Sequence, residues 1–467
     1  MKVEQIYTGC LAQGAYYIES NGEVAIIDPL REVQTYIDKA IQDKAVIKYI
    51  FETHFHADFV SGHVTLAEKT GGKIIYGPMA QPHFDAYIAK DEEVFQLGDT
   101  TITVLHTPGH TMESTCYLLK DNSGKDYALF SGDTLFLGDV GRPDLAQKAA
   151  DMTQEQLAGI LYDSLRKKIM PLADEVILYP AHGAGSACGK NLSKETVGTI
   201  GEQKITNYAL RADMTKEEFI VEVTDGLLPP PAYFPMNVKL NKEGYKDVEL
   251  IIEEAKALQP KEFEIAANET GALILDVRHQ NDFEAGHIPN SIFIGIDGAF
   301  APWVGALVLD YKQPILLVTP QGREREAITR LARVGYDNTI GYLDGGMNAW
   351  IEGGLDVATI TSIAATTLED VINENAMIFD VRKPGEYQAE HVDNVPSTPL
   401  DFINEYIATF PQDKSFYLYC AGGYRSMIAA SILKARGFHN VINVLGGYAA
   451  IKNTSIKRTD FSCSSVK

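Results

Sequence analysis

Two histidines and an aspartate stand close together in the motif THFHAD at residues 53–58, directly after the apolar run 46–51. Side chains on a strand alternate between faces, so His54 and His56 are expected to project from the same side where the strand ends. A single histidine at a strand end is more often an ordinary hydrogen-bonded residue. Imidazoles and a carboxylate that converge on one point, however, are typical ligands of a metal ion. The motif therefore predicts a metal site.

Three further strand ends carry polar side chains of the same kind. The apolar segments 101–105, 127–130 and 175–179 are followed by His110, Asp133 and His182, respectively. Runs of this length and composition are typical of buried strands. Four strand ends that deliver histidine and aspartate predict one edge of a β-sandwich that holds a metal.

These motifs resemble the signature of the metallo-β-lactamase fold, and the match covers about residues 1–240. In chain order the signature consists of HxHxD, the histidine of TPGH, Gly-Asp and a last histidine. The segment LFLGDVGRPD at 135–144 resembles the persulfide dioxygenase branch of that fold, whose members bind one iron. The resemblance implies an αββα sandwich. It implies the iron ligands His54, His110 and Asp133, with His56, Asp58, His182 and Arg142 around them. Arg142 either orients the site through Asp133 or Asp144 or forms an ordinary salt bridge.

The residue after Asp58 bears on the number of metal ions. Hydrolases of this fold, such as glyoxalase II, have a histidine there that binds a second zinc, and this chain has Phe59. Persulfide dioxygenases commonly keep that histidine too, so Phe59 departs from both groups, in the direction of a single metal. Two histidines and one carboxylate with open positions form the arrangement of non-haem Fe(II) oxygenases. The resemblance therefore implies one Fe(II) per chain and oxidation of a low-molecular-weight thiol persulfide by O₂ to sulfite.

Composition excludes several other functions. The chain has 467 residues, enough for about three domains. Its 63 acidic residues against 41 basic ones give a net charge of −22, which would repel nucleic acid. Neither a signal peptide nor an apolar run of about 18 residues is present, so we expect neither export nor a membrane span. A homo-oligomer stays an open alternative.

The five scattered cysteines predict free thiols in a reducing cytoplasm: Cys10, Cys116, Cys188, Cys420 and Cys463.

The second half of the chain repeats itself. LILDVR at 273–278 recurs as MIFDVR at 377–382, and LDGG at 343–346 recurs as VLGG at 444–447. Each copy alternates apolar strands with helix-like segments, which predicts a parallel sheet with helices on both faces. The expected domains are 1–258 with a C-terminal linker, 259–359, 360–456, and a tail at 457–467.

Both copies resemble rhodanese domains, which carry a sulfur atom on cysteine. In the second copy the strand 415–419 ends at CAGGYR, residues 420–425, and a helix follows. Glycines let successive N–H groups face one centre, and the helix N-terminus adds positive potential, so Cys420 is expected as a thiolate that carries a persulfide. Arg425 is expected to hold an oxyanion such as sulfite. The rest of this persulfide loop is Ala421, Gly422, Gly423, Tyr424 and Ser426.

The first copy lacks the nucleophile. Thr319 stands where Cys420 stands in the second copy, and Pro320 removes one N–H from the loop. We expect this copy to be an inactive spacer or docking module. A phosphatase is the rival interpretation of a cysteine loop followed by arginine. Phosphatases place five residues between the two, and this chain places four, which favours sulfur chemistry.

Three functional hypotheses remain open. The first is an iron dioxygenase fused to a sulfurtransferase that makes thiosulfate from sulfite and a persulfide. The second is a zinc-dependent, glyoxalase II-like thioester hydrolase fused to rhodanese modules, and the third is a non-catalytic sulfur carrier. Phe59 and the fusion disfavour the hydrolase, whereas the ligand set and Cys420 disfavour the carrier. Cys188, six residues after His182, either relays sulfur near the metal or is a plain buried thiol.

Overall fold

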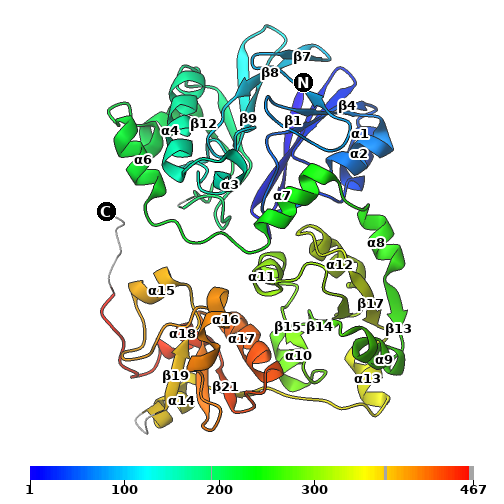
Figure 1. Cartoon of the computed structure of the whole chain (residues 1–467), viewed down its shortest axis with the longest axis vertical. Coiled ribbons are helices and arrows are strands. Elements are labelled where there is room, and N and C mark those ends of the chain that lie inside the picture. The colour runs from blue at the N-terminus through cyan, green and yellow to red at the C-terminus, as the bar shows by residue number, and fades with distance from the viewer. Residues whose placement is uncertain (191, 373–375, 462–467) are drawn as a thin grey trace. The chain divides into compact units, whose positions relative to one another are not determined.

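The chain is described by a computed structural model at residues 1–190, 192–372 and 376–461. Cys463 and the end of the expected tail lie outside the described residues. The chain forms two compact units (Figure 1). One unit holds Met1–Val248 together with Leu331–Gly335, and the other holds the remaining described residues from Glu249 onward.

The first unit contains two six-stranded sheets. In spatial order, the strands of one are β1 (Lys2–Thr8), β2 (Gln13–Ser20), β3 (Glu23–Ile27), β4 (Val46–Glu52), β5 (Lys73–Tyr76) and β6 (Tyr87–Ile88). Those of the other are β12 (Gly198–Thr199), β11 (Ile177–Pro180), β10 (Asp126–Gly132), β9 (Thr115–Lys120), β8 (Thr100–His106) and β7 (Val94–Leu97).

Helices cover the outer face of each sheet (Figure 1). Helices α1 (Gln34–Gln42) and α2 (His63–Thr70) pack on the first sheet, through Tyr36, Ala40 and Leu66. Helices α4 (Gln154–Ser164), α5 (Ile200–Thr206) and α6 (Lys216–Thr224) pack on the second. The unit also contains α3 (Gln147–Ala150) and α7 (Phe234–Glu243), and α8 (Val248–Glu254) follows at its end. The predicted αββα sandwich is confirmed.

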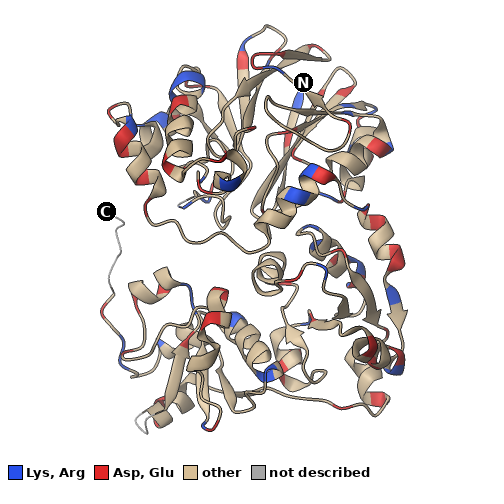
Figure 2. Cartoon of the chain, in the orientation of Figure 1, with Lys and Arg blue, Asp and Glu red and all other residues tan. Residues whose placement is uncertain are grey.

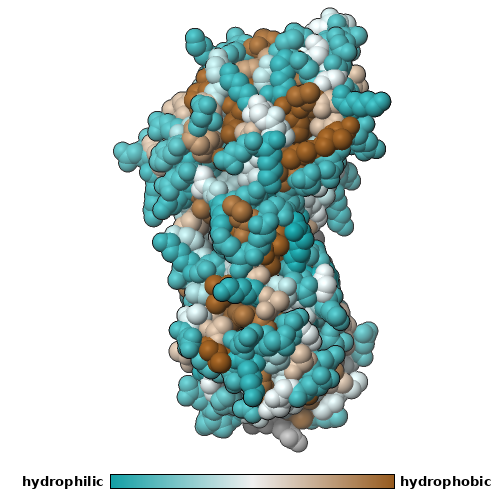
Figure 3. Space-filling view, turned by 90° about the vertical axis from the view of Figure 1, so that its right-hand side faces the viewer, coloured by the Kyte–Doolittle hydropathy of each residue, from teal (hydrophilic) through white to brown (hydrophobic). Residues whose placement is uncertain are grey.

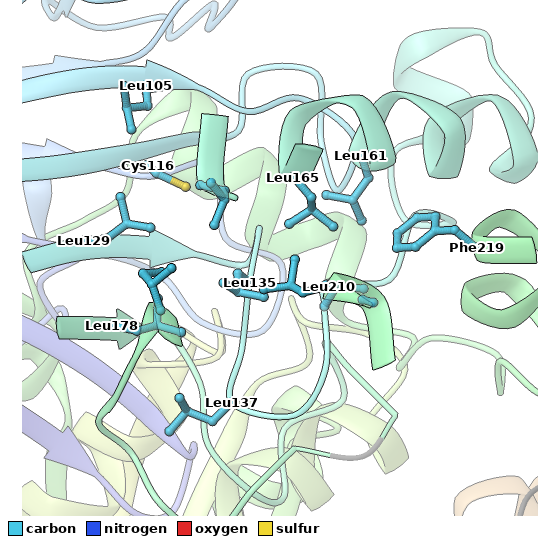
Figure 4. Close-up of a cluster of buried hydrophobic side chains, with 14 of the residues drawn as sticks. Leu105, Cys116, Leu129, Leu135, Leu137, Leu161, Leu165, Leu178, Leu210 and Phe219 are labelled. Atoms are coloured by element: carbon cyan, nitrogen blue, oxygen red, sulfur yellow. The ribbon is translucent and has the colours of Figure 1, made fainter. Parts of the chain in front are cut away.

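The helix-covered core of the second sheet is aliphatic. Figure 4 shows Leu105, Leu129 and Leu178 on the strands and Leu161 on α4, with Phe219 from α6 at the far side. Fully burying a leucine side chain stabilises a fold by about 1.5–3 kcal/mol. Cys116 lies within this cluster as a small apolar side chain. The cluster fixes β8, β10 and β11, the strands that lead to the polar residues.

The core between the two sheets is rich in aromatic side chains. Phe51 of β4 packs on Tyr117 of β9 at 4.7 Å between ring centroids, and Tyr16 of β2 packs on Phe130 of β10 at 5.0 Å. β8 and β10 both pair antiparallel with β9, and β10 pairs parallel with β11. β8, β10 and β11 therefore run in the same direction, and their ends reach one edge of the sheet.

The second unit holds two parallel sheets, as predicted from the repeat. The first sheet has β13 (Lys256–Leu258), β17 (Thr339–Leu343), β16 (Ile315–Val318), β14 (Leu273–Asp276) and β15 (Ile292–Phe293). The second has β18 (Thr361–Ile363), β21 (Val441–Val444), β20 (Phe416–Tyr419) and β19 (Met377–Asp380). The helices are α9 (Pro260–Thr270), α10 (Gln280–Ala285), α11 (Phe300–Leu307), α12 (Glu324–Ala332), α13 (Gly346–Glu352), α14 (Ala365–Val371), α15 (Pro384–Ala389), α16 (Ile403–Tyr406), α17 (Tyr424–Ala435) and α18 (Gly447–Ile451).

The first unit ends at Val248, and the expected domain boundary at residue 258 stays a prediction. The second unit begins at Glu249 because β13 pairs in parallel with β17, so 256–258 belong to its sheet. A short segment of the first repeat copy also clusters with the first unit. There the guanidinium of Arg31, which is fully buried, donates to the carbonyl of Ala332, and the N–H of Val60 donates to the carbonyl of Arg333.

The surface is mixed in character. In the view of Figure 2, basic and acidic residues are both scattered over the chain. On the face shown in Figure 3, hydrophobic residues form separate patches between hydrophilic ones. Among the described residues, no helix is both long enough and apolar enough to cross a membrane.

Candidate metal centre and cysteine loop

Three of the residues expected as ligands meet at the edge of the sandwich. His54 follows β4, His110 lies in the loop after β8, and Asp133 follows β10. All three are at most 2% exposed, and one potential ligand atom from each lies within 4.8 Å of the others. The Nε2 atoms of His110 and His54 lie 3.4 Å and 3.8 Å from Asp133 Oδ2. The structure thus brings together the predicted two-histidine, one-carboxylate set.

Hydrogen bonds fix which nitrogen of each imidazole faces the centre. The Thr53 hydroxyl donates to Asp28 Oδ2 at 2.8 Å, so its oxygen accepts from His54 Nδ1 at 3.0 Å. His110 Nδ1 lies 2.9 Å from the carbonyl oxygen of Arg142, which can only accept. Both rings therefore carry the proton on Nδ1 and present the Nε2 lone pair to Asp133. Orientation of this kind by outer groups is usual for metal-binding histidines.

The centre contains buried polar atoms that have no hydrogen-bond partner among the described residues. They include both carboxylate oxygens of Asp133, Oδ1 of Asp58 and Nε2 of His182. Such atoms are rare in proteins because burying an unpaired polar group costs free energy. A cation would satisfy them, and imidazole with carboxylate suits Fe(II) or Zn(II). Burial and neighbouring imidazoles also lower the pKa of His54 well below its usual range, which keeps the ring neutral and able to bind metal.

A second group of potential ligands lies beside the first. His56, Asp58 and His182 each offer an atom within 4.8 Å of the others. His182 Nε2 lies 3.4 Å from both Asp58 Oδ2 and Asp133 Oδ1, while its Nδ1 faces the Ala12 carbonyl at 3.3 Å. Phe59 is fully buried, and its ring packs against His56 with 4.3 Å between centroids. A second ion thus has potential ligands, although the expected histidine is replaced by phenylalanine.

Two buried carboxylates lie next to His56. His56 Nε2 lies 3.1 Å from Asp28 Oδ1 and 3.6 Å from Glu52 Oε2. Burial lowers the pKa of His56, but the carboxylates of Asp28, Glu52 and Asp58 outweigh this effect and raise it to about 9. Burial also raises the pKa of Glu52.

Arg142 contributes through two different groups. Its carbonyl holds His110, whereas its guanidinium forms two hydrogen bonds of 2.7 Å with Asp144. Of the expected alternatives, the structure contains the salt bridge with Asp144.

Cys188 is buried and shares a potential ligand cluster with Asp133 and His182. Burial and the carboxylates of Asp58 and Asp133 raise the pKa of Cys188, and its role as a sulfur relay stays a prediction.

The second cysteine site lies at the end of β20, where α17 begins. Cys420 is buried, and its Sγ accepts from the N–H of Gly423 at 3.1 Å. The Ser426 hydroxyl lies 3.6 Å from Sγ and donates to Asn443 Oδ1 at 2.7 Å. Gly423 has a φ of +102°, a backbone conformation that favours glycine. The loop therefore directs a backbone N–H at the sulfur, as expected for a group that carries negative charge.

Arg425 differs from its expected role in one respect. Its guanidinium donates to both carboxylate oxygens of Glu386, at 2.5 Å and 2.9 Å. Glu386 lies in the first turn of α15, and pairing with Arg425 lowers the pKa of its carboxyl although burial opposes this. Arg425 thus ties the loop to α15, and its fork is occupied rather than open for sulfite.

The comparisons with known proteins match both halves of this geometry. The model of the metallo-beta-lactamase superfamily matches residues 8–182, and that of the rhodanese-like domain matches residues 259–352 and 364–454. A crystal structure of a metallo-beta-lactamase from Staphylococcus aureus subsp. aureus COL is 31% identical, with a TM-score of 0.65 over 73% of this chain and 98% of that chain. The chain belongs to the metallo-β-lactamase superfamily and carries two rhodanese-like domains.

Curated relatives of the metallo-β-lactamase domain belong to two activity classes. The probable hydroxyacylglutathione hydrolase glo2 of Schizosaccharomyces pombe is 30% identical over 200 residues, which are 42% of this chain and 73% of the relative. A second probable hydroxyacylglutathione hydrolase of that yeast is 29% identical over 167 residues, which are 35% of this chain and 60% of its own length. The human mitochondrial persulfide dioxygenase ETHE1 is 27% identical over 221 residues, or 47% of this chain and 78% of the relative.

The first rhodanese-like domain has a loop closed by its own carboxylate. Glu324 Oε1 accepts from the N–H of Gly322 at 3.0 Å and from the hydroxyl of Thr319 at 3.2 Å. In the second domain, Arg425 occupies the position that matches Glu324. A carboxylate at the mouth of the loop repels a bound anion, which gives a second physical reason, besides Thr319, for an inactive copy.

Sequence reasoning missed three residues that support the metallo-β-lactamase site. Asn241 of α7 donates to the carbonyls of His56 and Phe59, both at 2.8 Å, and so fixes the metal loop. Asp28 and Glu52 pair with His56. Asp28 follows the apolar strand β3, so the strand-end rule that found the other carboxylates could have found it.

Proposed function

We propose that the metallo-β-lactamase domain is a non-haem iron dioxygenase that oxidises low-molecular-weight thiol persulfides to sulfite. The Cys420 rhodanese-like domain would then convert sulfite and a persulfide to thiosulfate. Together these reactions would detoxify persulfide sulfur. The free cysteines of the described chain suit a reducing cytoplasm.

The observation that carries the proposal is the ligand set His54, His110 and Asp133, with both imidazoles held in the same tautomer. These residues fit one Fe(II) and leave other positions around it open. Phe59 stands where hydrolases place a ligand for a second zinc. The similarity to human persulfide dioxygenase extends over 78% of that protein.

Each residue of the centre has a defined task. When bound, iron would supply the redox chemistry by which O₂ oxidises the terminal sulfur. His54, His110 and Asp133 would hold that ion, while Thr53 and the Arg142 carbonyl keep the imidazoles correctly oriented. The three side chains are at most 2% exposed, which would limit the access of bulk water to the reacting sulfur.

The rhodanese step needs only a nucleophile and its stabilising donor. The sulfur lone pair of sulfite attacks the outer sulfur of the Cys420 persulfide and forms the S–S bond of thiosulfate. The bond between that sulfur and Sγ breaks, and its electron pair returns to Cys420 as thiolate. The N–H of Gly423 stabilises this thiolate. Covalent fusion raises the effective concentration of sulfite at Cys420.

A thioester hydrolase with zinc is the second candidate. The specific observation in its favour is the group His56, Asp58 and His182, which could hold a second ion beside the first. The similarity to hydroxyacylglutathione hydrolases is of the same order as that to the dioxygenase. Phe59, which packs on His56 and is not a ligand, weighs against this candidate.

Two variants test the proposed function. His110→Ala should lose iron and O₂ consumption with glutathione persulfide, because two protein ligands hold Fe(II) poorly. Cys420→Ser should keep both and release sulfite in place of thiosulfate. Both anions are measured in one reaction after subtraction of their non-enzymatic combination. Retained iron and activity in His110→Ala would contradict the ligand assignment, and unchanged thiosulfate output in Cys420→Ser would contradict the transferase assignment.

A further inference from the structure

Tyr424, inside the persulfide loop, reaches out of its own rhodanese-like domain. Its hydroxyl donates to the carbonyl of Gly295 in the first rhodanese-like domain at 2.8 Å. Its ring meets Phe293 edge-on, with 5.7 Å between centroids. The neighbouring loop residues bind elsewhere, Gly423 to the Cys420 sulfur and Arg425 to Glu386. Tyr424 therefore joins the reactive loop to the copy that has no nucleophile.

The contact between Tyr424 and the first rhodanese-like domain requires residues without side chains beside the tyrosine ring. A Cβ atom on Gly298 would lie 2.3 Å from Tyr424 Cζ, and a Cβ on Gly295 would lie 3.2 Å from Tyr424 Cε2. Neither glycine has the positive φ that would explain it by backbone conformation alone. The space that the tyrosine ring occupies therefore explains Gly298. At Gly295 a Cβ would also lie 3.0 Å from the Arg278 carbonyl oxygen and from Phe293 Cζ. We call residues 295–298 the tyrosine seat.

The seat is held in place by the inactive loop itself. Arg323, which occupies the position in the first copy that Tyr424 occupies in the second, donates to Asp297 at 2.7 Å. Arg330 of α12 donates to the Ile296 carbonyl at 2.6 Å. A second tie joins the domains nearby, where the Ser431 hydroxyl oxygen of α17 accepts from the Phe293 N–H at 3.0 Å. The loop of the first copy, which lacks the cysteine, thus supports the residues that contact the Cys420 loop of the second copy.

We propose that the first rhodanese-like domain is a positioning element of the Cys420 site, acting through the tyrosine seat. Tyr424 is the positioning residue, because it neighbours Gly423, whose N–H must stay aimed at Sγ while the thiolate leaves. The proposal rests on the sulfur transfer proposed above. It gives the inactive copy a role in catalysis that Thr319 and Glu324 deny it as a sulfur carrier.

The alternative is that Tyr424 contributes only to packing between the two domains. A packing role predicts lower stability with unchanged kinetics at Cys420. A positioning role predicts a lower kcat for thiosulfate formation at an unchanged KM for sulfite, since the bound loop no longer holds its donor against the leaving sulfur. It also predicts slower alkylation of the Cys420 thiolate by iodoacetamide, which requires no sulfur transfer.

The test compares three variants of the full-length chain. Tyr424→Phe removes the hydroxyl that bonds Gly295, and Asp297→Asn weakens the brace from Arg323. Tyr336→Phe is the matched control, because it also removes a hydroxyl that donates to a backbone carbonyl in the first domain, that of Val308. Thermal unfolding, steady-state kinetics with sulfite, and alkylation of the Cys420 peptide measured by mass spectrometry are recorded for each.

We expect Tyr424→Phe to lower kcat and the alkylation rate roughly two- to tenfold, the effect of one hydrogen bond. Asp297→Asn should act in the same direction, and the double variant should be no slower than Tyr424→Phe, because both act through one seat. Tyr336→Phe should keep wild-type rates. Wild-type rates in Tyr424→Phe, or equal slowing in all three variants, would overturn the proposal. If the wild-type chain forms no thiosulfate, the proposed function fails, while the alkylation rates still decide the positioning.

Discussion

The hydroxyl of Thr53 is expected to control metal affinity without touching the metal. It donates to Asp28 and accepts from His54 Nδ1, and the Thr53 N–H also donates to Asp28 at 2.8 Å. Thr53→Val keeps the shape of the side chain but leaves the Nδ1–H of His54 unsatisfied inside the protein. An unsatisfied buried donor costs about 1–3 kcal/mol. Loss of a group that orients a metal ligand typically weakens binding about 10- to 100-fold.

Metal affinity of the Thr53→Val variant is measured anaerobically by competition with a chelator. The matched control is Thr103→Val, on β8 of the same domain, because in the described part of the chain the Thr103 hydroxyl is buried without a hydrogen-bond partner. The control should bind metal like the wild type and be at least as stable. Equal affinities for Thr53→Val, Thr103→Val and the wild type would refute the proposed orientation of His54.

Three further changes have defined outcomes. Phe59→His should allow a second metal ion to bind with Asp58 and His182, and a metal content that stays at one ion per chain in excess zinc would show that another feature excludes it. Asn241→Ala should destabilise the first unit by about 2 kcal/mol or more, measured by urea unfolding, since two buried carbonyls lose their donor. Burial lowers the pKa of His287 to about 4, whereas its pKa in the unfolded chain is about 6.5. The contribution of His287 to stability is therefore present above pH 6.5 and is lost as the pH falls towards 4. The urea midpoint of the second unit should fall over that interval, and less so in His287→Phe; equal slopes would contradict this.

The metal centre could be predicted because its residues follow apolar strands. The ends of neighbouring strands meet at one edge, so His54, His110, Asp133 and His182 were expected to converge. Asn241 could not be found in this way. It lies 185 positions from His56, on a helix whose polar pattern indicated a linker.

The partner of a charged side chain is equally hard to predict from the sequence. Arg425 was expected to bind an anion, and the carboxylate that takes its fork, Glu386, comes from a helix 39 positions earlier. Likewise, Thr319 marked the first copy as inactive, but nothing in its motif indicated the contact between Tyr424 and Gly295. Repeats and strand ends predict which elements form, whereas contacts between elements require the three-dimensional structure.

The choice between dioxygenase and hydrolase rests most directly on metal content measured together with O₂ uptake. The chain is purified anaerobically, its iron and zinc are determined per chain, and the same sample receives glutathione persulfide or a glutathione thioester. Our account predicts about one iron per chain, O₂ consumption with the persulfide and no hydrolysis of the thioester. Two zinc ions per chain with thioester hydrolysis and no O₂ uptake would contradict it.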